Sequence, residues 1–101
     1  MKTIPAIILT ISALVCANLA EAGDATAGQA KATLCAACHG LDGISPNDLW
    51  PNLKGQKEGY LIKQIKAFRD GVREDATMLP MVKPLTDEDI ENIAAFYSSL
   101  K

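Results

Sequence analysis

Residues 35–39, Cys35-Ala36-Ala37-Cys38-His39, decide how the rest of this chain is interpreted. Two thiols three positions apart can add to the two vinyl groups of one haem, and the imidazole that follows can ligate its iron. This C-x-x-C-H spacing is the signature of c-type haem attachment. Because so short a motif also arises by chance, the interpretation needs three supports: an export signal, a distant sulfur ligand, and helices to surround a porphyrin.

The first 22 residues have the pattern of an export signal. Lys2 provides a positive start, residues 4–19 a mostly apolar run, and Ala20-Glu21-Ala22 a small-x-small cleavage site. The alternatives are an uncleaved anchor and a lipoprotein, but polar residues interrupt a run already short for the roughly 20 apolar residues of a membrane span. We therefore expect a leader over 1–22, cleavage after about Ala22, and a periplasmic domain over 23–101.

Length and charge limit the function of this domain. The whole chain has 101 residues, which allows one small domain. A chain below roughly 80 residues usually needs a staple, a metal or a cofactor in addition to its apolar core. The net charge of −2 and the lack of a basic cluster argue against nucleic-acid binding.

Other roles for the two mature thiols, Cys35 and Cys38, fit less well. Exported cysteines can form a disulfide, but a thioredoxin-type pair belongs in a βαβ setting and no stretch alternates like a strand. A structural zinc site needs four ligands, and blue copper usually takes two histidines and one cysteine. His39 is the only histidine in the chain. Covalent haem uses both thiols and the imidazole.

Hydrophobic periodicity predicts three helices. The first begins near Ala25, capped by Asp24 or Thr26, and continues through the cysteine pair; the second covers about 58–69; the third begins at the cap Thr86. Gly28 is expected where the first and last helices cross, with Phe96 or Tyr97 over the gap. Residues 40–56 and 71–85 are predicted loops. The candidate haem-pocket side chains are Trp50, Leu53, Tyr60, Ile65 and Met81.

The second predicted loop contains two methionines, Met78 and Met81. A methionine here can simply fill a gap, but a thioether is also the ligand that, with histidine, raises the potential of a haem. Spacing alone leaves both residues open as the distal ligand.

At this point the chain resembles a small monohaem bacterial class I cytochrome c, of the cytochrome c-553 or c4-domain type. The resemblance covers nearly all of residues 23–101, and one haem motif without a repeat implies one haem c. It implies an all-α class I cytochrome c fold of three to four helices, with the terminal helices crossing beside the haem. The matching segments are residues 23–28, 35–43 with Pro46, 52–56, 78–81 and 84–90.

The resemblance also implies roles for individual residues. In such sequences the ligand methionine lies eight residues before the cap of the last helix, which selects Met78 relative to Thr86. The proline after the haem motif, Pro46, corresponds to the one whose carbonyl accepts the N–H of the ligand histidine, here His39. Cys35 and Cys38 would carry the thioethers.

With both axial positions filled, the iron has no open site for a substrate, so the expected function is one-electron transfer rather than catalysis. The expected partners are a redox donor and a redox acceptor, and the membrane enters only through their complexes. One alternative is a haem-bearing electron-entry subunit held on a larger oxidoreductase. Another is a haem-based sensor whose methionine leaves the iron.

Overall fold

The computed structural model of the protein describes residues 2–7 and 23–101. The expected leader lies mostly outside these residues and stays a prediction. The described chain is helical and contains no strand, which confirms the all-α prediction. No helix within it is long and apolar enough to cross a membrane. The five helices of this part of the chain are α1 (Ala25–Lys31), α2 (Thr33–His39), α3 (Glu58–Arg69), α4 (Met78–Val82) and α5 (Asp87–Ser99).

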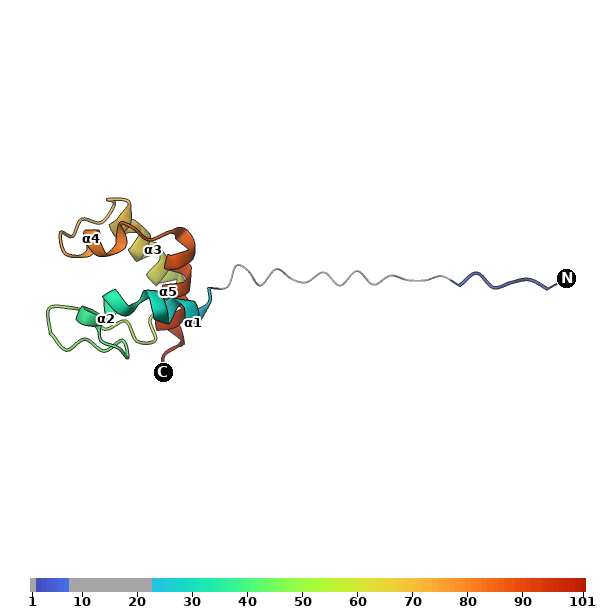
Figure 1. The fold of residues 1–101 in the computed structure, drawn as a ribbon, viewed down its shortest axis with the longest axis horizontal. Coiled ribbons are helices and arrows are strands. Elements are labelled where there is room, and N and C mark those ends of the chain that lie inside the picture. The colour runs from blue at the N-terminus through green and yellow to red at the C-terminus, as the bar shows by residue number, and fades with distance from the viewer. Residues whose placement is uncertain (1, 8–22) are drawn as a thin grey trace.

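Helix α5 is the centre of the domain, with α1 and α3 packed on it (Figure 1). Ile90, Ile93, Ala94 and Tyr97 are buried along α5, as the periodicity predicted. Phe96 is buried as well, because α1 and α3 both pack on α5. The core cluster consists of Ala32, Leu61, Ile93, Ala94, Phe96 and Tyr97.

The predicted first helix forms in two parts, α1 and α2, separated at Ala32. Asp24, and not Thr26, caps α1: its carboxylate accepts hydrogen bonds from the backbone N–H groups of Thr26 (2.9 Å) and Ala27 (3.2 Å). At the junction the hydroxyl of Thr33 donates to the carbonyl of Ala30 at 2.9 Å. Such a side-chain bond competes with the helical backbone ladder and loosens it locally.

Helix α3 begins and ends at the residues that the periodicity indicated, Glu58 and Arg69. Helix α5 begins after a capping box in which Thr86 and Asp89 each accept a hydrogen bond from the other's backbone N–H. A serine or threonine cap followed by acidic residues is a strong local signal for a helix start. These two helices confirm the sequence prediction.

The second predicted loop, residues 71–85, contains the short helix α4, so the prediction of continuous loop was wrong there. Asp75 starts this helix, since its carboxylate accepts from the N–H groups of Thr77 and Met78, both at 2.9 Å. Pro80 is tolerated because it lies in the first turn, where a backbone N–H has no helical partner. Figure 1 shows that α2 and α4 extend to the same side of α5, away from the crossing with α1.

Candidate haem-attachment site

Helix α2 brings the three residues of the motif to one face. Cys38 and His39 follow Cys35 by three and four residues, the spacing at which helical side chains lie above one another. Both cysteines are free thiols and are half-buried. Burial raises the pKa of the Cys35 thiol, with a smaller contribution from neighbouring Cys38, so Cys35 stays protonated at neutral pH. The two thiols are thus presented side by side on one turn of helix.

His39 is held in a defined orientation. Its ring is buried, 8% exposed, and Nδ1 lies 2.8 Å from the backbone carbonyl of Pro51. Because a carbonyl only accepts, Nδ1 carries the proton and donates it. The neutral ring then has its lone pair on Nε2, the form in which histidine ligates a metal.

The acceptor for His39 is Pro51 and not Pro46, so that part of the prediction was wrong. Pro46 is exposed, in a turn where the hydroxyl of Ser45 bonds to the backbone of Asn47. The amides of Leu53 and Lys54 donate to the carbonyl of Gly43 at 2.8 and 3.0 Å. This closure brings the end of the loop, rather than its middle, back to α2.

The two candidate sulfur ligands lie differently on α4. Met78 is the first residue of the helix and is half-buried, whereas Met81 is 41% exposed. Val82, the buried anchor of α4 at 2% exposure, lies four residues after Met78 and therefore shares its face. Met78 thus faces the interior more than Met81 does.

The candidate pocket residues separate into two groups. Leu53 and Ile65 are half-buried and pack against the core cluster. Trp50, Tyr60 and Met81 are exposed, as are several other large apolar side chains in the first loop and in α4. These exposed apolar side chains lie in the first loop, in α3 and in α4, the segments next to the attachment motif and the candidate methionines. The further exposed residues of this kind are Leu41, Ile44, Leu49 and Leu79.

The donor set fits a haem better than a bare metal ion. In residues 2–7 and 23–101, no group of three or more His, Cys, Asp or Glu side chains could hold an ion. His39 offers one oriented nitrogen, and the cysteines offer thiols suited to covalent attachment.

The hydroxyl of Tyr97 is buried and has no hydrogen-bond partner among the described residues. Burial raises the pKa of Tyr97, and neighbouring Cys35 raises it further. Cys35 packs against the core cluster that contains Tyr97.

A helical domain with an oriented histidine directly after a pair of free thiols defines a c-type haem protein. Comparison with known proteins agrees: residues 25–101 match the cytochrome c family, and the chain belongs to that family. It is 53% identical over 81 residues to cytochrome c-554(548) of Halomonas halodenitrificans, which covers 77% of this chain and 98% of the relative.

The chain is also similar to one half of larger proteins. It is 44% identical over 100 residues to cytochrome c4 of Pseudomonas aeruginosa, covering 99% of this chain and 49% of that protein. The crystal structure of reduced cytochrome c4 from Pseudomonas stutzeri superimposes with a TM-score of 0.75 at 46% identity, covering 79% of this chain and 47% of that one. The chain therefore spans about half the length of its cytochrome c4 relatives. The fold is that of a class I cytochrome c, and the cofactor is covalently attached haem c.

Proposed function

We propose that residues 23–101 form a periplasmic shuttle domain that passes single electrons between a donor and an acceptor protein. In this proposal Cys35 and Cys38 attach the haem, and His39 and Met78 are its axial ligands. The observation that carries it is the hydrogen bond from Nδ1 of His39 to the carbonyl of Pro51, 2.8 Å long, since it fixes the ring and leaves the lone pair on Nε2 free to ligate a metal.

Attachment needs only the groups that α2 presents. Cys35 and Cys38 would hold the haem through two thioether bonds, each formed by addition of a thiol across one vinyl group, with the sulfur on one carbon and the thiol proton on the other. No group leaves and no oxidant is consumed. The half-buried positions of Cys35 and Cys38 keep both thiols close to the face that the haem covers.

When bound, the haem supplies one-electron chemistry between ferrous and ferric iron. The residues of this chain set its properties: the hydrogen bond to Pro51 makes His39 a stronger donor, and a thioether ligand raises the potential. Filling both axial positions excludes a substrate from the iron. We therefore assign the chain no catalytic reaction of its own.

The first test is the mass of the mature protein purified from the periplasm. We expect a chain beginning at about Gly23 with one haem added, and no haem on Cys35→Ala/Cys38→Ala. A haem-less protein with a Cys35–Cys38 disulfide would overturn the proposal. The start near Gly23 is supported by the backbone N–H of Asp24, which donates to the side-chain carbonyl of Asn92 at 2.8 Å and so ties the first residues of the domain to α5.

A second measurement separates a free shuttle from a fixed subunit and from a sensor. A shuttle purifies alone, whereas a fixed electron-entry subunit purifies at constant stoichiometry with its oxidoreductase. The far-red sulfur-to-iron charge-transfer band of the ferric protein reports methionine ligation. Its retention during redox cycling supports an electron carrier, and its loss on one redox change would favour a sensor.

A further inference from the structure

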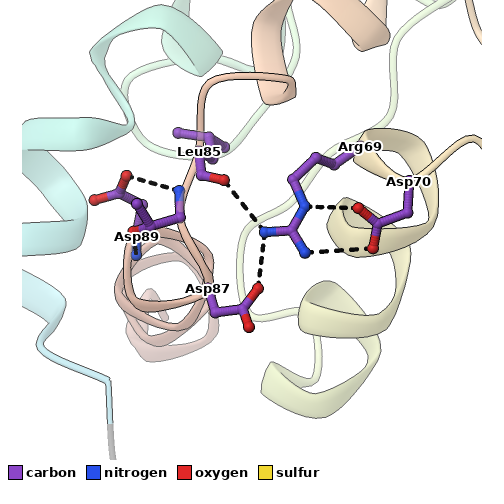
Figure 2. A network of polar contacts seen from close by, with 6 residues as sticks. Arg69, Asp70, Leu85, Asp87 and Asp89 are labelled. Atoms are coloured by element: carbon purple, nitrogen blue, oxygen red, sulfur yellow. Dashed lines mark hydrogen bonds and ion pairs between the residues drawn. The ribbon is translucent and has the colours of Figure 1, made fainter.

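Arg69, the last residue of α3, joins two parts of the chain that are far apart in sequence. Its side chain is 18% exposed. Nε and Nη2 contact the two carboxylate oxygens of Asp70 at 2.9 and 3.3 Å. Nη1 donates to the carbonyl of Leu85 at 3.2 Å and pairs with the carboxylate of Asp87 at 2.8 Å (Figure 2). One guanidinium thus binds both ends of the segment 70–85.

This geometry is stronger than an ordinary surface ion pair. Isolated exposed pairs contribute little because water screens them. Here the planar guanidinium makes a two-point contact with Asp70 and also reaches a backbone carbonyl and a second carboxylate. The side-chain hydrogen bond from Arg69 lowers the pKa of Asp70, and Asp70 and Asp87 together raise the pKa of Arg69. Arg69 and Asp70 therefore remain charged across the neutral range.

Apart from the contacts of Arg69, the segment 70–85 is attached at its ends and through α4, which packs on α3. Residues 70–77 are exposed, and Val82 is the one buried residue of α4. Arg73 secures the beginning of the segment on α3, where it stacks over the ring of Phe68 and donates to the side chain of Gln64 at 2.9 Å. At the far end Leu85 packs against the core cluster, and within the segment its N–H donates to the carbonyl of Val82 at 3.0 Å.

The clamp formed by Arg69, Asp70, Leu85 and Asp87 therefore acts on α4 through a short path. Leu85 is bonded to Val82, and Val82 shares a helical face with Met78. We propose that Arg69 is a positioning residue for Met78: by fastening both ends of the segment 70–85, it keeps the thioether on the iron. This inference rests on the proposed function, since it takes Met78 as the distal ligand.

The test uses the complete haem-loaded ferric protein and added imidazole, which competes with methionine for the iron. Imidazole can bind only when the segment 70–85 moves away from the iron. A weaker clamp makes this movement easier and should therefore raise the apparent affinity for imidazole. For Arg69→Gln we expect a rise of at least tenfold, together with loss of the charge-transfer band at lower temperature. Asp87→Asn should act in the same direction. Asp70→Asn weakens the two-point contact with Arg69 but leaves the contacts with Leu85 and Asp87, so it should raise the affinity by less than Arg69→Gln does.

Two controls separate positioning from general destabilisation. Asp24→Ala removes the cap of α1 and lowers global stability without contact with the segment 70–85. Even if Asp24→Ala lowers the free energy of unfolding as much as Arg69→Gln does, its imidazole affinity should stay near that of the wild type. Arg69→Lys keeps the charge but not the planar contacts, so it should not restore the wild-type affinity.

The outcomes distinguish this inference from the proposed function. If Met78→Ala strongly raises imidazole affinity while Arg69→Gln stays within about twofold of the wild type, the clamp proposal is overturned and the ligand assignment stands. The clamp proposal is likewise overturned if Asp24→Ala raises the affinity as much as Arg69→Gln does. If Met78→Ala changes nothing, both the ligand assignment and the positioning role of Arg69 fail.

Discussion

Gly28 of α1 lies so close to Asn92 of α5 that a β-carbon at position 28 would overlap the Asn92 carbonyl group. The same β-carbon would lie 2.9 Å from the backbone nitrogen of Ile93. The two helices therefore cross with their backbones in contact, as the sequence predicted. The three nearest atoms belong to Asn92 and Ile93, one turn before the expected Phe96 and Tyr97, which lie in the core cluster together with Ala32.

Gly28→Ala should consequently destabilise the protein. Alanine favours a helix over glycine by up to ~1 kcal/mol, but here the added methyl meets backbone, which cannot rotate away, and overpacking costs about 1–3 kcal/mol. Gly59→Ala is the matched control, since nothing lies within 4 Å of a β-carbon there. Denaturant unfolding should show a loss for Gly28→Ala and no loss for Gly59→Ala. Equal stability of the two variants would contradict a tight crossing.

Met78→Ala and Met81→Ala should differ in their effect on the haem. Removing the thioether of Met78 should lower the reduction potential and abolish the charge-transfer band, because sulfur ligation favours ferrous iron. Met81 is 41% exposed, so its loss should cost less than the ~2–5 kcal/mol of a buried methionine and leave the potential nearly unchanged. Potentiometric titration of both variants decides the assignment. A fall in potential for Met81→Ala alone would reverse it.

The capping box of α5 should make stability depend on pH on the acid side. Hydrogen bonding from the backbone N–H of Thr86 lowers the pKa of Asp89 in the folded protein. Its contribution is therefore complete above the unfolded pKa of about 3.9 and is lost as the pH falls through the lower folded value. Asp89→Asn should cost about 0.3–1 kcal/mol at neutral pH and little in acid. Thermal unfolding at neutral pH and at a pH below the folded pKa of Asp89 measures this difference in stability. Glu88→Gln, at an exposed position of the same helical turn, is the control.

Tyr97→Phe tests whether the buried hydroxyl of Tyr97 has a hydrogen-bond partner at the attachment face. A hydroxyl without a partner costs about 1–3 kcal/mol, whereas a satisfied one contributes about 1 kcal/mol. We expect the haem-loaded variant to be less stable by about 1 kcal/mol, because in the loaded protein a group at the attachment face would be the partner of the Tyr97 hydroxyl. Denaturant unfolding of the haem-loaded protein gives the value. An increase in stability on substitution would show that the hydroxyl stays unpaired.

The sequence by itself determined the features that depend on neighbouring residues. Helix α3 follows from the spacing of its apolar residues, and the start of α5 follows from Thr86 and the acids after it. The attachment motif and its face on α2 follow from the three- and four-residue spacing of Cys35, Cys38 and His39. All of these are set by the period of the helix or by hydrogen bonds over three or four residues, which a sequence displays directly.

The tertiary structure decided what depends on loop closure. Pro46 and Pro51 are equally good candidates for a turn, and only the bonds from Leu53 and Lys54 to Gly43 select Pro51 as the partner of His39. Similarly, Arg69 looks like one more surface charge at the end of a helix until the chain returns Leu85 and Asp87 to it. Such partners lie far apart in sequence, and their pairing depends on the path that the packed helices impose on the chain between them.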